Sequence, residues 1–354
     1  MTITNRHLCL TTLSIVLFLP ALRPVLAQAA GAALLFDSHD VMSVRIEAPI
    51  STLMQERPDE EYLDGKFFYA DDSGNEVALD LKLQTRGITR RKKDICNFPP
   101  IRLNFRKKQV EGTLFAGQDK LKLVTHCQAN KPSFEQLVLR EYIAYRILQT
   151  ITDKSFRSRL MHITYLDTED DNDPAVKYGF VIEDEDNLGE RIGMTAAKVS
   201  GIKVEELDLR HANLISVFEY LIGNTDFSLI LGPADKNCCH NAVLYGNGGP
   251  PYTSIPYDFD YSGIVNAPYA APNPRFKLRS VKQRLYRGRC VNNDLLDETF
   301  AHYLDKEAEI RSLVDNLEGL DERDGRDVHN YLNAFYKDIT NPKMKQRRFI
   351  RDCL

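Results

Sequence analysis

The sequence predicts a two-lobed α+β protein, and three observations support this fold class. Up to Ser133 the chain holds several short runs in which apolar and polar residues alternate, as in strands with one buried face. At Ser133 the apolar spacing changes to three and four, which predicts one long helix. After Glu183 the pattern becomes mainly helical, with one short hairpin. We therefore expect a β-rich lobe over residues 28–190, a mainly helical lobe over residues 191–354, and a ligand in the cleft between them.

The composition is that of an ordinary globular chain. Of its 354 residues, 43% are hydrophobic and 27% are charged, which excludes a disordered or collagen-like protein. Lys plus Arg number 46 and Asp plus Glu number 50, so the formal net charge is −4. Without an overall positive field, we expect no nucleic-acid partner.

The N-terminal residues 1–27 have the pattern of a secretory signal peptide. Arg6 and His7 precede an apolar run from Leu8 to Leu22, and Val25-Leu26-Ala27 is a small-x-small cleavage pattern. The run is too short to span a bilayer comfortably, which disfavours the alternative of an uncleaved anchor. We expect cleavage after Ala27, with Ala29 as a second possible site, and no membrane span in the mature chain.

The cysteines agree with export to a periplasmic or extracellular compartment. Cys9 leaves with the leader, and the mature chain keeps six: Cys96, Cys127, Cys238, Cys239, Cys290 and Cys353. An even number in an oxidising compartment predicts up to three disulfides, whose pairing the sequence does not fix. The adjacent Cys238-Cys239-His240 lacks metal-site spacing, so we expect two disulfides to different partners there.

The elements follow in order along the chain. Strands are expected at residues 42–48, 77–83, 101–105, 121–124, 160–166 and 178–182, and a hairpin at residues 242–245 and 252–256. The first helix should run from Phe134 to about Ile151, with Ser133 and Gln136 as a capping box. A second should cover residues 211–222 and stop at Gly223, and the tail from about residue 293 to 339 should be helical.

Polar residues at the ends of elements in the second half are the candidates for chemistry. Asp226 follows the helix that stops at Gly223, Asn241 opens a strand, and Asp258 and Asp260 follow the next strand. Oxygen ligands of this kind hold Mg²⁺ beside phosphates, while a separate carboxylate orients an acceptor hydroxyl. A structural turn or a Ca²⁺ site is the alternative for the D-x-D pair.

The order of motifs resembles the CotH (spore coat protein H) kinase family. The resemblance covers roughly residues 77–263 and is carried by R-G-x-T-R, a Leu-Lys-Leu strand, an L-R-E-Y helix, a strand ending in Glu, G-N-x-D, an Asn-led strand and I-P-Y-D-F-D. It implies a protein-kinase-like fold and ATP and Mg²⁺ as cofactors.

The resemblance also implies roles for single residues. Asp226 matches the catalytic Asp that accepts the hydroxyl proton, and Asn241 and Asp258 match the Mg²⁺ ligands, with Asp260 as a helper. Lys122 would contact the α- and β-phosphates and Glu141 would pair with it. Because the strand register is not fixed by sequence, Lys120 and Arg102 are alternatives to Lys122, and a solvated surface position is the plain alternative for Lys122 and Glu141. Glu183 matches the hinge.

A basic run lies over residues 86–108. Its cations, Arg86 and Arg102 among them, would face phosphates, or would form a solvated face that docks an anionic polymer.

These expectations lead to one function and one alternative. We expect an exported kinase-like phosphotransferase that moves the γ-phosphate of ATP to a hydroxyl of a protein or small molecule. The alternative is a non-catalytic nucleotide- or metal-binding protein, or a scaffold at the envelope surface.

Overall fold

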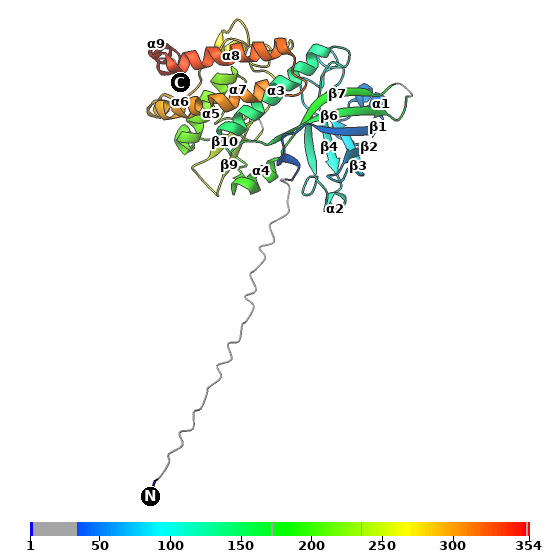
Figure 1. Ribbon diagram of the computed structural model, residues 1–354. Helices are drawn as coiled ribbons and strands as arrows, with labels where there is room; N and C mark the ends of the chain where they lie inside the picture. The colour runs from blue at the N-terminus through cyan, green and yellow to red at the C-terminus, as the bar shows by residue number, and fades with distance from the viewer. Residues whose placement is uncertain (3–33, 171–172, 235, 352) are drawn as a thin grey trace.

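A computed structural model describes residues 1–2, 34–170, 173–234, 236–351 and 353–354 (Figure 1). Apart from its first two residues, the expected leader over residues 1–27 lies outside the described residues.

The strands of the first half close into a seven-stranded barrel. They are β1 (Met42–Ala48), β2 (Leu63–Ala70), β3 (Glu76–Thr85), β4 (Ile101–Phe105), β5 (Lys120–Val124), β6 (Ser158–Asp167) and β7 (Ala175–Ile182). Neighbours in the barrel follow the order β1-β2-β3-β4-β5-β7-β6, and all pairs are antiparallel except the closing pair of β1 with β6. Closure leaves the barrel no unpaired edge strand.

Alternation along the strands fills the barrel with apolar side chains. In β4, Ile101, Leu103 and Phe105 are buried, whereas Arg102 and Asn104 between them are partly exposed. Inward-facing residues of all seven strands, such as Phe67, form one hydrophobic cluster. The interior is therefore packed and the polar side chains of β3, β4 and β5 lie outside.

A second core joins the barrel to the helices of the C-terminal half. Helix α3 (Pro132–Ile151) packs on the outer face of β7 and also contacts α7 (Glu307–Asp315) and α8 (Glu322–Thr340). Figure 1 shows α3 between the barrel and these helices. Helices α5 (Leu209–Ile222) and α6 (Leu296–Asp305) complete this half.

A small sheet and short helices complete the architecture. The sheet has the order β10 (Thr253–Pro256), β9 (Ala242–Gly246), β8 (Thr195–Ala196). The short α-helices are α1 (Ile50–Glu56), α2 (Lys107–Val110), α4 (Glu185–Ile192) and α9 (Pro342–Lys345). Four 3₁₀ segments cover Leu34–Phe36, Val204–Glu206, Pro274–Phe276 and Cys290–Leu295, and a π-helical turn covers Gln346–Ile350.

The expected two-lobed kinase-like α+β fold is wrong. The first half is a closed mixed barrel, and the small sheet and helices that follow share a core with its outer face through α3. The parallel pairing of β1 with β6 joins residues more than a hundred positions apart, such as Met42 and Met161. Hydrophobic alternation reports that a strand has a buried face but not which strand lies beside it.

Most single elements match their expected positions, and two expectations need correction. The strands at Met42–Ala48 and Ile101–Phe105 have the expected bounds. Strand β2 was missed because Gly65 and mixed burial interrupt its alternation. The capping box does not form: Lys131 is the N-cap of α3, and the amide of Gln136 instead bonds to the backbone of Gly319 and Asp321.

Three disulfides form within the described residues, in agreement with the prediction of up to three from the even cysteine number. Cys96 pairs with Cys127, and Cys290 with Cys353. Cys238 and Cys239 pair with each other, so the expectation that each reaches a different partner is wrong.

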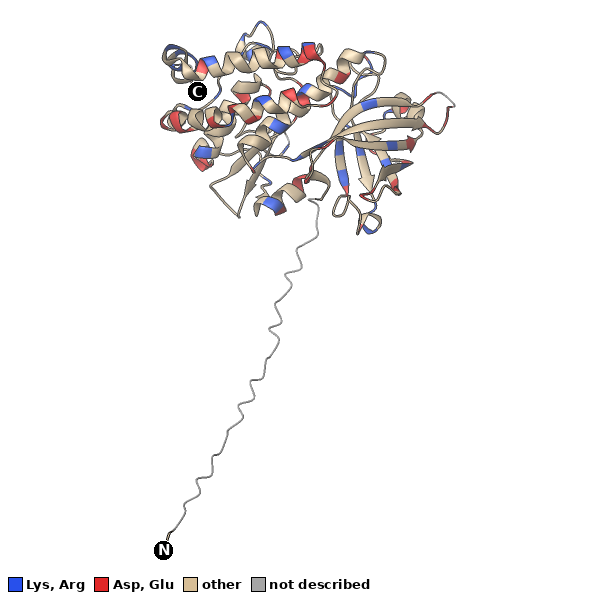
Figure 2. Cartoon of the chain, in the orientation of Figure 1, with Lys and Arg blue, Asp and Glu red and all other residues tan. Residues whose placement is uncertain are grey.

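Charges of both signs are spread over the barrel and the helices (Figure 2). Within the described residues, no helix combines the length and apolar character needed to cross a membrane.

Candidate functional site

The open end of the β9–β10 hairpin brings three predicted site residues together. Antiparallel pairing places Ala242 opposite Pro256, so Asn241 and Asp258 flank the last paired residues. The backbone N–H of Tyr257 donates to the carbonyl of Asn241 at 3.0 Å, which extends the pairing by one step. Asp226 reaches this point from the turn after α5, where Gly223 ends the helix with a φ of 68°.

Asp226 is held by the hairpin. Its Oδ1 lies 2.8 Å from Nε2 of His240, and its Oδ2 accepts from Nδ2 of Asn241 at 3.1 Å. The same Nδ2 donates to the backbone carbonyl of Asp226 at 2.7 Å. These contacts use the Nδ2 of Asn241 and leave its Oδ1 out of the contact with Asp226. The Asp226 side chain is still 34% exposed.

The two proposed oxygen ligands share an uncommon backbone conformation. Asn241 has a φ of 51° and Asp258 a φ of 66°, in the left-handed region that residues with a Cβ seldom adopt. The N–H of Asp258 donates to the hydroxyl of Tyr145 at 2.9 Å, which fixes this turn against α3. Such conformations at the ends of strands are over-represented at ligand sites.

Arg90 lies at the centre of the acidic residues. Its guanidinium is 3.2 Å from Glu141, 3.2 Å from Asp260 and 3.4 Å from Asp258. Arg90, Glu141 and Asp260 are buried, whereas the side chain of Asp258 is 41% exposed. One buried cation therefore contacts two buried carboxyls and a third that faces solvent.

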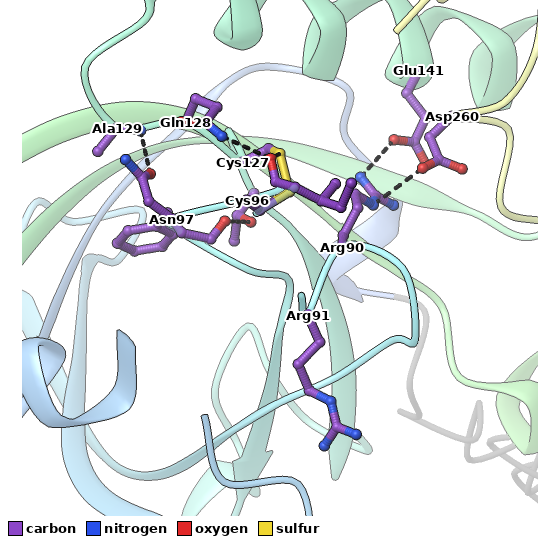
Figure 3. The surroundings of a disulfide bond; sticks show 12 residues. Arg90, Arg91, Cys96, Asn97, Cys127, Gln128, Ala129, Glu141 and Asp260 are labelled. Carbon is purple, nitrogen blue, oxygen red and sulfur yellow. Dashed lines mark hydrogen bonds and ion pairs between the residues drawn. A yellow bond between two sulfur atoms is a disulfide. The ribbon is translucent and has the colours of Figure 1, made fainter. Parts of the chain in front are cut away.

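A disulfide fixes the segment that carries Arg90. Figure 3 shows Arg90 pointing toward Glu141 and Asp260, with the Cys96–Cys127 bond beside it. The bond ties the connection between β3 and β4 to the one between β5 and α3. The side chain of Asn97 accepts from the backbone of Ala129 at 2.8 Å and strengthens this link.

Burial raises the pKa of two carboxyls in this cluster. The pKa of Glu141 is raised by burial and by the charges of Asp260 and Asp258, although Arg90 opposes the shift. The pKa of Asp260 is raised by burial and by Asp258, against the effect of Arg90. Burial and the proximity of the carboxyls therefore favour the neutral forms of Glu141 and Asp260.

Lys122 does not form the pair expected for it. Its Nζ lies 2.8 Å from Glu185 at the start of α4 and 4.7 Å from the ring centroid of Tyr257, while Glu141 pairs with Arg90. The expectation of a Lys122–Glu141 pair is therefore wrong, because Arg90 reaches Glu141 from another connection. Arg102 is the cross-strand partner of Lys122, so both cations lie on the outer face of the barrel.

Arg86 and Glu183 take different positions relative to the acidic residues. The pKa of Arg86 is lowered by burial and by the charge of Arg90, while the charges of Asp258 and Glu141 oppose this, so Arg86 lies in their electrostatic range. Glu183 is turned away, because both its oxygens bind Arg191, at 2.9 and 2.8 Å. The hinge expected at Glu183 is therefore a buried ion pair, and its carboxylate is not available to a nucleotide. Lys120 is exposed at the outer end of β5.

A buried carboxyl lies behind the Asp226 turn. Burial raises the pKa of Glu219 to about 8, although Asn224 and the charge of Arg287 oppose this. Arg287 donates to the carbonyls of Thr225, at 3.0 Å, and Phe227, which bracket Asp226. The turn is thus supported from its inner side.

The donor set fits a hard cation at Asn241 and Asp258 but not at Asp260. An exposed carboxylate and a side-chain carbonyl are ligands that Mg²⁺ accepts. Asp258 also contacts Arg90 but its side chain is exposed, whereas the carboxyl of Asp260 is buried between Arg90 and Tyr269. Within the described chain, no three His, Cys, Asp or Glu side chains are grouped to hold a metal ion.

The cavities found do not coincide with the expected cleft. One of about 480 Å³ opens beside α1, lined by Met54, Arg57 and Lys93 among others. Another, beside Arg90 and Glu141, measures about 10 Å³, which is at most enough for one water molecule.

Two site residues were missed by the analysis of the sequence. Arg90 is one of several arginines in the basic run, and only its contacts distinguish it. His240 was considered only as a metal ligand, yet it contacts Asp226. Its position directly before Asn241 in the sequence was the available signal that it lies near the candidate site.

No protein-family model matches the chain, and no curated protein matches it.

Proposed function

We propose that the protein is an exported phosphotransferase that transfers the γ-phosphate of ATP to a hydroxyl acceptor in the presence of Mg²⁺. The observation that carries this proposal is the junction of Asp226, Asn241 and Asp258 at one end of the β9–β10 hairpin. The motif order that resembles the CotH kinase family supports the same activity.

The residues divide into two tasks. Asn241 and Asp258 would hold Mg²⁺, which when bound supplies positive charge to the phosphate oxygens. Asp226 accepts the proton of the acceptor hydroxyl as its oxygen bonds to the γ-phosphorus, while the bond from that phosphorus to the bridging oxygen breaks and ADP leaves. His240 and Asn241 keep the Asp226 carboxylate in one orientation for this step.

Cations beside the hairpin would balance the nucleotide phosphates. Lys122 and Arg102 lie on the same outer face of the barrel, and Lys122 lies over Tyr257, the neighbour of Asp258. Arg86 lies within electrostatic range of Asp258. Arginine and lysine are the usual partners of phosphate oxygens.

Export is part of the proposal. Three disulfides within the described chain are compatible with an oxidising compartment, and the leader-like pattern in the sequence supports secretion or a periplasmic location.

A non-catalytic nucleotide- or metal-binding protein, or an envelope scaffold, is the second candidate. Two observations favour it. Both carboxylate oxygens of Asp226 already have hydrogen-bond partners, and Lys122 already forms an ion pair with Glu185. In such a protein Asp226 would be a structural residue only.

Two variants separate the candidates. Asp258→Ala should abolish Mg²⁺-dependent ATP binding while the protein stays folded. Asp226→Asn should keep the affinity for ATP within a few-fold but lower phosphate incorporation by roughly 10²-fold or more, the usual weight of a general base. Calorimetry with ATP and Mg²⁺, with Ca²⁺ alone as a control, and radiolabelled phosphate incorporation measure both.

Binding without incorporation by the wild-type protein would favour the scaffold. Equal incorporation by wild type and Asp226→Asn would remove the catalytic role of Asp226.

A further inference from the structure

All charged side chains between Asp260 and Asp294 are basic. They are Arg275, Lys277, Arg279, Lys282, Arg284, Arg287 and Arg289. We call residues 275–289 the cationic segment. In the chain no charged residue separates it from Asp260, in a protein whose net charge is −4.

Two arginines of the cationic segment fasten it to the turn that carries Asp226. Arg284 donates to the carbonyls of Tyr220 and Leu221 at the end of α5, at 3.0 and 3.1 Å, and to that of Tyr331 at 2.6 Å. Arg287 donates to the carbonyls on either side of Asp226. Backbone carbonyls therefore hold both guanidinium groups against this turn.

Aromatic contacts place the N-terminal part of the cationic segment, at Phe276, beside the same turn. The guanidinium of Arg287 lies 4.6 Å from the ring centroid of Phe227 and 4.7 Å from that of Phe276. Phe227 is the next residue after Asp226, and Phe276 lies between Arg275 and Lys277. One cation thus joins the two stretches, and stacking of this kind is favourable.

Four other cations of the cationic segment, all in its N-terminal part, face solvent. Arg275, Lys277, Arg279 and Lys282 are exposed. Within the described residues, none of these four side chains forms an ion pair with a carboxylate. They are therefore four positive charges without an ion-pair partner, on a segment that Arg287 ties to the turn carrying Asp226.

We propose that the cationic segment is the docking surface for the acceptor, and that the acceptor is an acidic protein segment whose hydroxyl is presented to Asp226. This inference rests on the proposed phosphotransferase function for the role of the hydroxyl. The docking itself requires no turnover. Positive patches of this kind raise association rates and select partners of opposite charge.

The extent of the patch favours a short acidic segment over a nucleic acid. Four exposed cations match a few carboxylates of a peptide, whereas a nucleic acid spreads its charge over a longer surface. Beyond the segment the protein has more acidic than basic residues, so a long polyanion would be repelled there.

The test uses the full mature protein and three synthetic peptides of equal length. Each holds one serine, flanked by glutamates, glutamines or lysines, and binding is followed by fluorescence anisotropy at low and high salt. The variant Arg275→Gln/Lys277→Gln/Arg279→Gln removes three charges. Arg106→Gln/Lys107→Gln/Lys108→Gln removes the same charge from an exposed part of the barrel and is the control.

We expect the glutamate peptide to bind wild type and the control variant equally, and the segment variant about tenfold more weakly, the combined effect of three exposed ion pairs. High salt should remove the difference. Equal binding of the glutamate and glutamine peptides, or equal affinity of the two variants, would overturn the inference. Tighter binding of inorganic polyphosphate or of single-stranded DNA matched in charge would also overturn it.

Phosphate incorporation into the same peptides separates this inference from the proposed function. Incorporation without preference for the glutamate peptide overturns the docking surface and leaves the transfer reaction intact. Charge-dependent binding without any incorporation supports the surface and overturns the transfer reaction.

Discussion

Replacing Arg90 with methionine removes the guanidinium that contacts Glu141, Asp258 and Asp260. Methionine keeps much of the length and the apolar stem of the side chain. The Cys96–Cys127 disulfide stays in place, so the connection between β3 and β4 remains tied. The change therefore tests the charge of Arg90 more than the position of its backbone.

The loss of stability follows from the two buried carboxyls that lose their cationic partner. Glu141 and Asp260 are 2% and 5% exposed, and removing the partner of a buried ion pair costs about 3–5 kcal/mol. Protonation limits this cost: holding a proton at pH 7 on a carboxyl with an unfolded pKa near 4.5 costs ~3.5 kcal/mol, at about 1.4 kcal/mol per pH unit.

The sign of the pH dependence follows from the same residues. The pKa of Asp260 is raised to about 6 in the folded protein by burial, although Arg90 opposes this, and loss of Arg90 raises it further. An acid with a raised folded-state pKa lowers stability as the pH rises above its unfolded pKa. Asp260 is ionised in wild type at pH 7.5 but keeps its proton in Arg90→Met, so the deficit should be small near pH 5 and reach about 2 kcal/mol near pH 7.5.

Urea denaturation with intact disulfides, at pH 5 and pH 7.5, measures the deficit. Arg91→Met is the matched control, because Arg91 pairs with Asp59 where both side chains are partly exposed, and should lose at most about 1 kcal/mol. The double variant Arg90→Met/Glu141→Gln should recover part of the loss at pH 7.5. A deficit equal to that of Arg91→Met, or one that does not change with pH, would refute the reasoning.

Three further predictions concern other parts of the molecule. The pKa of Glu219 is raised to about 8 by burial, so Glu219→Gln should gain about 3 kcal/mol relative to wild type between pH 5 and pH 7.5, as measured by urea denaturation at several pH values; a constant difference would contradict this. Replacing Cys96 and Cys127 by alanine opens a loop with a sequence separation of 31 and should cost about 3–4 kcal/mol. Trypsin should then cut faster after Arg90 to Lys93, and unchanged cleavage would show that the disulfide does not hold Arg90. The intact mass of exported protein should correspond to a chain that begins near Gln28. On reduction the mass should rise by two hydrogen atoms for each of three disulfides, whereas six free thiols would contradict the prediction.

Local pattern was sufficient for most single elements. Strand β4 and the C-terminal end of α5 lie where alternation and the stop at Gly223 predicted them. These features depend on neighbours in the chain, because a half-buried strand repeats every two residues and an αL cap favours glycine. The disulfide count followed from the cysteine number, but the pairing of Cys238 with Cys239 did not.

The candidate site was predicted in its residues and not in all of its contacts. Turn signals predicted the positions of Asp226, Asn241 and Asp258 at the ends of a helix and two strands, and the structure brings Asp226 into contact with Asn241. The partner of Glu141 was not predictable in this way. Several cations could reach a buried carboxyl, and which one does so depends on the path of the connection between β3 and β4.

The sequence by itself determined the alternating strands, the helix stops, the even set of cysteines and the acidic and amide residues at element ends. Each of these depends on propensities and spacings within a few residues. Only the tertiary structure decided that β1 pairs with β6 to close a barrel, that Arg90 contacts Glu141 and Asp260, and that the cationic segment lies beside the turn carrying Asp226. These contacts join residues from distant parts of the chain, and packing of the whole core selects them among many pairings that local pattern allows.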